Sequence, residues 1–138
     1  MSTYVVPNEP RRGGINLDFY GRYYITVDHR LQADQNALLA TLAHECGHVH
    51  HRHGLHVNHG ALAGMELDAD CYAARTLVQQ KHWAVLDALR QFVGACGDWP
   101  SGPPGYPSCN QRLEQINACA DGPVLPTLRG LPQPIISR

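Results

Sequence analysis

The 138-residue sequence lacks several features that would assign it to a class at once. No apolar run approaches the roughly 20 residues that a membrane-spanning helix needs, so we expect no membrane span. The net charge is −1 with histidine neutral, and without a basic excess there is no electrostatic indication of a nucleic-acid partner. The N-terminus has no basic start followed by an apolar stretch, so we see no signal peptide. These absences favour a soluble, cytoplasmic protein.

The cysteines form no CxxC pair, which argues against a structural zinc knuckle. Five are present: Cys46, Cys71, Cys96, Cys109 and Cys119. The last three lie among glycines and prolines and would suit one disulfide, with another partner possible. The alternative is that the cysteines are reduced and serve as small apolar residues. Because disulfides persist in oxidising compartments, the cysteine content keeps an extracytoplasmic location open.

What the sequence does contain suits a single globular domain. Its length fits one domain, with 43% hydrophobic and 17% charged residues. We find no internal repeat and no second-domain boundary, so residues 1–138 are taken as one unit. Residues 1–14 are expected to form an extended or loose N-terminal arm, because prolines and glycines interrupt any regular element. The Pro-rich tail, residues 121–138, is expected to be irregular.

Local patterns predict a short stretch of strand followed by helices. Residues 15–19 and 23–27 read as strands that could form a hairpin around a turn at residues 20–22. Helices are predicted over residues 35–53, 62–80, 83–93 and 109–118. Asp34 and Ser108 are the expected N-caps of the first and last of these, and Gly54 fits the end of the first. The prediction is an α+β fold that is mainly helical.

The first long helix carries the pattern H-E-x-x-H at residues 44–48. Residues four apart share a helix face, so His44 and His48 can converge on one ion. Glu45 would lie beside the ion and take a proton from a water that zinc has made more acidic. Cys46 is turned away from this face and is predicted to lie in the core. The alternative is a solvated, histidine-rich helix face.

The second helix supplies what the motif lacks. Two histidines leave a third protein ligand to be found, and Glu66 follows His48 by 18 residues. Asp70 lies one turn after Glu66 and can accept a hydrogen bond from the second ring nitrogen of His44. The other common third ligand, a histidine six residues after His48, is excluded because that position is Gly54. By themselves, Glu66 and Asp70 would be ordinary surface acids.

These motifs together resemble the catalytic core of gluzincin peptidases of the HtpX and CAAX-prenyl-protease type. The resemblance covers about residues 23–118. It rests on the strand at 24–27, the H-E-x-x-H helix followed by Arg52 and His53, the E-x-x-x-D helix, and a Pro-Ser…Arg-Ile segment at residues 107–116. It implies a zincin-like core in which an active-site helix packs beside a glutamate helix. Because no membrane helices are expected, the chain is most similar to the soluble minigluzincins.

Tyr106 departs from that family's pattern, because it stands where a histidine is frequent. Its hydroxyl could donate a hydrogen bond to a developing oxyanion, or its ring could be a packing residue at the end of a loop. A second resemblance is to ImmA/IrrE-type proteins, which are regulatory zinc-dependent proteases with a similar pair of helices. The Pro-Ser…Arg segment favours the first family.

The sequence therefore predicts a zinc-dependent endopeptidase with one catalytic Zn²⁺, acting on a peptide or protein substrate. The strand at residues 23–27 is expected to hold that substrate in extended form by backbone pairing. The alternatives are an ImmA/IrrE-like regulatory protease, a non-catalytic zinc-binding module on the same scaffold, and a metal-handling protein. The last would use five further histidines: His50, His51, His53, His56 and His59. The substrate and the oligomeric state do not follow from the sequence.

Overall fold

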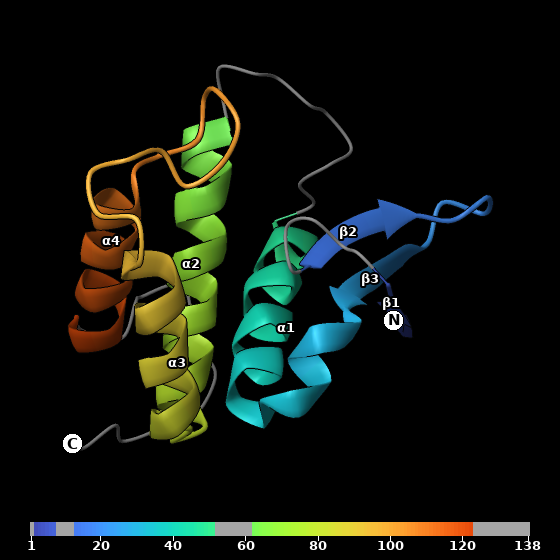
Figure 1. Cartoon of the computed structure of the whole chain (residues 1–138), viewed down its shortest axis with the longest axis horizontal. Coiled ribbons are helices and arrows are strands. Elements are labelled where there is room, and N and C mark those ends of the chain that lie inside the picture. Colours follow the sequence, from blue (N-terminus) through green and yellow to red (C-terminus); the bar gives the residue numbers. More distant parts are fainter. Residues whose placement is uncertain (1, 8–12, 52–61, 123–138) are drawn as a thin grey trace, which may run out of the picture.

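A computed structural model describes residues 2–7, 13–51 and 62–122 of the chain. These residues form a mainly helical α+β fold with four α-helices and a three-stranded sheet (Figure 1), which confirms the predicted class. The elements are β1 (Ser2–Val6), β2 (Gly13–Leu17), β3 (Tyr23–Asp28), the 3₁₀ helix η1 (His29–Ala33), α1 (Gln35–His50), α2 (Leu62–Gln79), α3 (Trp83–Gly94) and α4 (Cys109–Asp121). None of these helices is both long and apolar enough to cross a bilayer.

The predicted elements are confirmed, with shifted ends. The first hairpin strand begins two residues earlier than predicted, and α4 continues to Asp121 instead of ending at residue 118. Both predicted caps are present, because the Asp34 side chain accepts the Ala37 amide and Ser108 forms a capping box with Gln111. Helix α1 was predicted to reach residue 53, but it ends at His50, because the backbone of His51 leaves the helical conformation with φ of −87° and ψ of 2°. The expected stop at Gly54, the connector at 54–61 and the tail from residue 123 lie outside the described residues.

The prediction that residues 1–14 contain no regular element was wrong. Ser2–Val6 form β1, which pairs in parallel with β3, and Gly13 and Gly14 begin β2. The β-formers Tyr4, Val5 and Val6 precede Pro7, so the proline follows the strand instead of interrupting it. Since β2 pairs antiparallel with β3 on the other side, the strand order is β1-β3-β2, with β3 in the centre.

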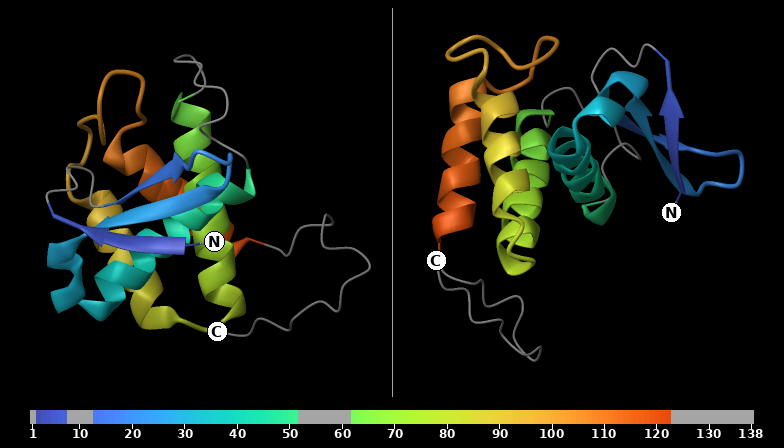
Figure 2. Two further views of the ribbon diagram at one scale, coloured as in Figure 1. Left: turned by 90° about the vertical axis from the view of Figure 1, so that its right-hand side faces the viewer. Right: turned by 60° about the horizontal axis from the view of Figure 1, so that its bottom comes forward.

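Helix α1 lies between the sheet and the other helices (Figure 2). A cluster formed by Ile25, Val27, Leu31 and Ala37 joins one side of α1 to the sheet. A larger cluster on its other side joins α1 to α2, α3 and α4, with Leu86 and Ile116 fully buried. Burying a side chain of that size stabilises the fold by about 1.5–3 kcal/mol. Because both sides of α1 are covered, its position is determined by two cores.

Two disulfides join elements that carry the site described below. Cys71–Cys119 links α2 to α4, and Cys96–Cys109 links the end of α3 to the start of α4. A disulfide within the last three cysteines was one of the two alternatives that the sequence left open, and the structure has it as Cys96–Cys109. Cys71 is the further partner, paired with Cys119. Cys46 is the free thiol, half-buried against the cluster between α1 and the sheet, as predicted.

Candidate metal centre

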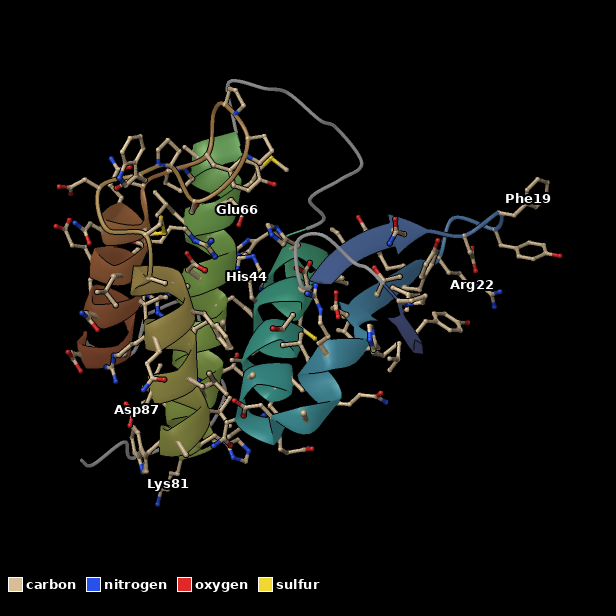
Figure 3. The ribbon with its side chains drawn as sticks, viewed as in Figure 1. Phe19, Arg22, His44, Glu66, Lys81 and Asp87 are labelled. Atoms are coloured by element: carbon tan, nitrogen blue, oxygen red, sulfur yellow. A yellow bond between two sulfur atoms is a disulfide. The ribbon has the colours of Figure 1, made fainter. Side chains whose placement is uncertain are left out.

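His44, His48 and Glu66 bring three potential metal ligands to one point between α1 and α2. Figure 3 shows His44 on α1 and Glu66 on α2 close to each other. His44 and His48 lie one turn apart on α1, and their Nε2 atoms are 3.0 Å apart. The Glu66 carboxylate on α2 faces both rings, with Oε2 3.1 Å from Nε2 of His44 and Oε1 3.2 Å from Nε2 of His48. The cluster could therefore hold a metal ion.

The arrangement of donor atoms suits a small divalent cation. In a tetrahedral zinc site with bonds of about 2.0–2.1 Å, neighbouring ligand atoms are about 3.3 Å apart. The 3.0 Å between the two Nε2 atoms is close to that edge length, and each carboxylate oxygen of Glu66 lies a similar distance, 3.1 or 3.2 Å, from a different one of the two rings. Two imidazoles and a carboxylate are also a donor set that zinc accepts at catalytic sites. The residues present therefore fit zinc.

Asp70, one turn after Glu66 on α2, orients the first histidine. Its Oδ1 atom lies 2.8 Å from Nδ1 of His44, and the Asp70 side chain is fully buried. A proton on Nδ1 of His44 is therefore donated to Asp70, which leaves the Nε2 lone pair directed at the cluster. This arrangement of carboxylate, histidine and metal position holds the ring in one tautomer and orientation.

Arg112, on α4, binds the carboxylate of Asp70 and so holds the residue that orients His44. Its Nε donates to Oδ2 of Asp70 at 2.7 Å, and its Nη2 donates to Oδ1 at 2.8 Å. Such a two-pronged contact fixes the plane of the carboxylate. The sequence indicated Arg112 only as part of a resemblance, without a role, because nothing in the local pattern places α4 against Asp70. Arg112 therefore fixes Asp70, and Asp70 in turn fixes the ring of His44.

The charges at the centre are mutually stabilised despite burial. Burial disfavours the charged form of His44, but its contacts with Asp70 and Glu66 outweigh this effect and raise the pKa to about 10. Burial likewise favours the neutral acids, yet the histidine contacts hold the pKa of Glu66 well below its usual range. The contacts of Asp70 with Arg112 and His44 lower its pKa in the same way. The acids thus stay ionised, and the centre attracts positive charge, either as a proton on His44 or as a cation in its place.

Gly47 explains how α1 and α2 come close enough to share ligands. A Cβ atom at this position would lie 2.6 Å from the carbonyl oxygen of Ala69 and 2.7 Å from its Cα. No side chain fits there, because the obstruction is backbone. The glycine inside the H-E-x-x-H pattern therefore permits the close approach that brings Glu66 and Asp70 to the two histidines.

Glu45 lies in the wall of a pocket of about 790 Å³ that also contains the three potential ligands. Its side chain is buried, and the start of β2 packs over it: a Cβ at Gly13 would lie 3.4 Å from Cγ of Glu45 and 2.6 Å from Cγ2 of Thr41. The remaining lining comes from Gly14, Ile15, Ala40, Met65, Leu89, Phe92, Val93, Ala95, Cys96, Pro100, Ser101, Gly102, Pro103, Tyr106, Cys109 and Arg112.

Tyr106 belongs to the loop between α3 and α4, which closes one side of the pocket. Its ring is half-buried and packs on Gly102, where a Cβ would lie 2.5 Å from the ring. The Cys96–Cys109 disulfide ties the two ends of this loop together. The structure thus brings Tyr106 to the same pocket as Glu45, and the packing against Gly102 accounts for its position in the loop.

The strand that lines the pocket is β2, and this corrects one prediction. We expected residues 23–27 to pair with a substrate, but they form β3, whose two sides are occupied by β1 and β2. The central position of β3 was not predicted, because the strand β1 that covers its second edge was not predicted either. Among the described strands, β2 is the one that is both at an edge of the sheet and at the pocket.

Within the described residues, no second group of metal-ligand type was found. His50 is stacked on Tyr72, with ring centroids 4.6 Å apart, and His51 makes edge contacts with both rings. His53, His56 and His59 lie outside the described residues. Comparisons with protein-family models, with curated protein sequences and with solved structures found no match to this chain.

Proposed function

We propose that the protein is a zinc-dependent endopeptidase with a zincin-like core. The observation that carries the proposal is the convergence of His44, His48 and Glu66 on one point, with Glu45 beside them in a pocket large enough for a peptide. The ligand-type residues alone would support a binding site. Glu45 is not needed to hold an ion, and its position in the same pocket is what favours hydrolysis.

The residues of the chain divide the reaction between them. His44, His48 and Glu66 would hold the ion, and zinc bound there would supply Lewis acidity and make a water molecule more acidic. Glu45 accepts a proton from the attacking water and passes it to the leaving amine. Asp70 and Arg112 keep His44 in the orientation that binding requires. Tyr106 is the candidate donor to the oxyanion that develops on the substrate carbonyl.

The substrate is proposed to lie in extended form along β2. An edge strand offers backbone N–H and C=O groups that can pair with another chain. Gly13 and Gly14 line the pocket at the start of this strand, and Ile15 follows them along the wall. A side chain at Gly13 would meet Thr41, so the glycine lets β2 lie close to α1 at the pocket. Backbone pairing of this kind binds many sequences, so it suits a peptidase for polypeptides more than an enzyme for one small molecule.

The two disulfides favour a protein that matures in an oxidising environment. This proposal differs from the cytoplasmic location favoured by the N-terminal sequence. It can be tested by counting free thiols in the unfolded protein before and after reduction. One free thiol before reduction, from Cys46, and five afterwards would agree with it. Five thiols in both samples would contradict it.

The variant Glu45→Gln tests the proposed reaction. Its amide cannot accept the proton, so cleavage of unfolded polypeptides should fall on the order of a thousandfold while zinc content stays the same. Glu114→Gln is a matched control, because Glu114 is an exposed acid on α4. If Glu45→Gln cleaves as well as the wild type, the mechanism is wrong. If the wild type binds zinc and cleaves nothing, the chain is a non-catalytic zinc-binding module on this scaffold.

A further inference from the structure

The tip of the β2–β3 hairpin presents two aromatic side chains to solvent. Phe19 is 97% exposed and Tyr20 is 79% exposed, the two highest values among the exposed large hydrophobic residues. The tip points away from the body of the molecule (Figure 3). Neither side chain contributes to the two hydrophobic clusters, so the core does not account for their presence.

The tip is held by a dense set of local contacts. Oδ1 of Asp18 accepts the amides of Tyr20 and Arg22, each at 2.8 Å, and Oδ2 accepts Nε of Arg22 at 2.9 Å. Gly21, with φ of +76°, allows the turn. The Phe19 and Tyr20 rings meet edge to face at 5.7 Å, and the Arg22 guanidinium lies 5.2 Å from the Tyr20 ring centroid. The aromatic pair is therefore presented in a defined arrangement.

Strand β2 connects this tip directly to the pocket. Gly13, Gly14 and Ile15 line the pocket, and the strand then leads to Phe19. At about 3.4 Å per residue, the three steps from Gly14 to Leu17, where β2 ends, span about 10 Å, and Phe19 lies two residues further on, in the turn. An extended chain paired with the edge of β2 advances at the same rate, so its residue beside Phe19 lies about five positions from the residue beside Gly14.

We propose that Phe19 and Tyr20 form a remote binding site for the same extended polypeptide that occupies the pocket. This inference rests on the proposed function and adds a substrate class: unfolded or flexible polypeptides with an apolar residue about five positions from the cleavage site. The occupant is apolar because Asp18 and Arg22 neutralise each other, which leaves the aromatic rings as the recognition surface. An anionic lipid surface would call for an excess of positive charge that the tip does not have.

The test compares a long substrate with a short one. Reduced, carboxymethylated ribonuclease A serves as the unfolded polypeptide, and the short substrate is a synthetic peptide with about three residues on each side of a cleavage site found in it, too short to reach the tip. In the variant Phe19→Ser/Tyr20→Ser, the ratio of kcat/KM for the long substrate to that for the short one should fall about tenfold. Tyr4→Ser is the control: Tyr4 is a 54% exposed aromatic on β1, at the opposite edge of the sheet, and its variant should keep the wild-type ratio.

Each other outcome overturns the inference in an identifiable way. A wild-type ratio in the double variant refutes the remote site and leaves the peptidase proposal intact. An equal fall for Tyr4→Ser shows a general effect of exposed aromatic residues. Loss of co-sedimentation with phosphatidylserine-containing vesicles, at an unchanged ratio, assigns the tip to a lipid surface instead. If the wild type cleaves neither substrate, the proposed function fails, and the remote site fails with it.

Discussion

The two walls of the pocket are built in different ways. The helical wall is the part of the lining that comes from α1, α2 and α4, and it contributes side chains that carry or can gain a charge, namely His44, Glu45, His48, Glu66 and Arg112. Asp70 lies fully buried behind this wall, against His44 and Arg112. The rest of the lining, here called the opposite wall, comes from β2, α3 and the loop between α3 and α4, and it contributes uncharged residues: glycines, prolines, apolar side chains, Ser101 and Tyr106. The helical wall supplies side chains that can bind metal or transfer protons, while the opposite wall supplies backbone groups and the shape of the pocket.

Under the proposed function, the helical wall carries out the reaction and the opposite wall binds the substrate. Charged side chains at the metal centre must be held in place, and α1, α2 and α4 do so through tight packing, a disulfide between α2 and α4, and the contacts of Arg112. A wall that binds an extended polypeptide needs the edge of a sheet beside the pocket, and β2 is an edge strand at that place. Substitutions on the helical wall should therefore affect metal binding strongly, and substitutions on the opposite wall should affect it weakly.

The largest effect is expected for Glu66→Ala. Removing one of three protein ligands should weaken zinc binding on the order of a thousandfold, a larger loss than those caused by residues that only orient a ligand. Competition with a fluorescent zinc chelator measures the change. Glu114→Ala, on the exposed side of α4, should bind zinc as the wild type does. Unchanged affinity in Glu66→Ala would exclude Glu66 as a ligand.

Arg112→Leu should weaken zinc binding about tenfold to a hundredfold, because Asp70 loses its two-pronged partner and His44 loses its fixed orientation. The same chelator competition measures it. Gln115→Leu is the matched control, since Gln115 lies one turn later on α4 and donates to the carbonyl of Leu67. Equal losses in the two variants would mean that α4 acts only through packing against α2.

Gly47→Ala tests the close approach of α1 and α2. Alanine normally stabilises a helix interior relative to glycine by about 0.5–1 kcal/mol. Here the methyl group meets the backbone of Ala69, so the free energy of unfolding should fall by about 1–3 kcal/mol. Gly64→Ala, in α2 with nothing within 4 Å of the added Cβ, should show the ordinary stabilisation. Urea unfolding measures both, and stabilisation in both variants would refute the account of Gly47.

The smallest effect is expected on the opposite wall. Ser101 lines the pocket and donates a hydrogen bond to the carbonyl of Pro107 within the loop. Ser101→Ala should reduce the free energy of unfolding by about 1 kcal/mol and change zinc affinity by less than about twofold. Chelator competition measures the zinc affinity. A tenfold loss in Ser101→Ala would show that the opposite wall also contributes to metal binding.

The predictable part of the molecule is the part encoded locally. The N-caps Asp34 and Ser108, the placement of H-E-x-x-H on a helix and the strand predicted at residues 23–27 follow from short patterns. Each is found where it was expected, the strand with one residue more at its end. The hydrogen bond between Asp70 and His44 was also anticipated, because helix spacing limits what Asp70 can reach. These features depend on residues within a few positions of one another or on two helices that must pack.

The unpredicted part depends on tertiary context. The strand β1 was missed because nearby prolines and glycines masked its β-forming residues, and with it the central place of β3. Arg112 reaches Asp70 across 42 residues of sequence, and Cys71 pairs with Cys119 across 48. No local pattern specifies such pairs, because they depend on how α4 docks against α2.

The central claim is that His44, His48 and Glu66 form a single zinc site. It is tested most directly by measuring how many zinc ions the chain binds and which residues are needed to bind them. Purified protein, stripped of metal and titrated with zinc against a competing chelator, should bind one ion tightly per chain. That ion should be lost in Glu66→Ala and retained in His50→Ala/His51→Ala, since His50 and His51 contact Tyr72 instead of the metal centre. Several weakly bound ions per chain that are lost in the His50/His51 variant and retained in Glu66→Ala would contradict the account and identify a metal-handling protein.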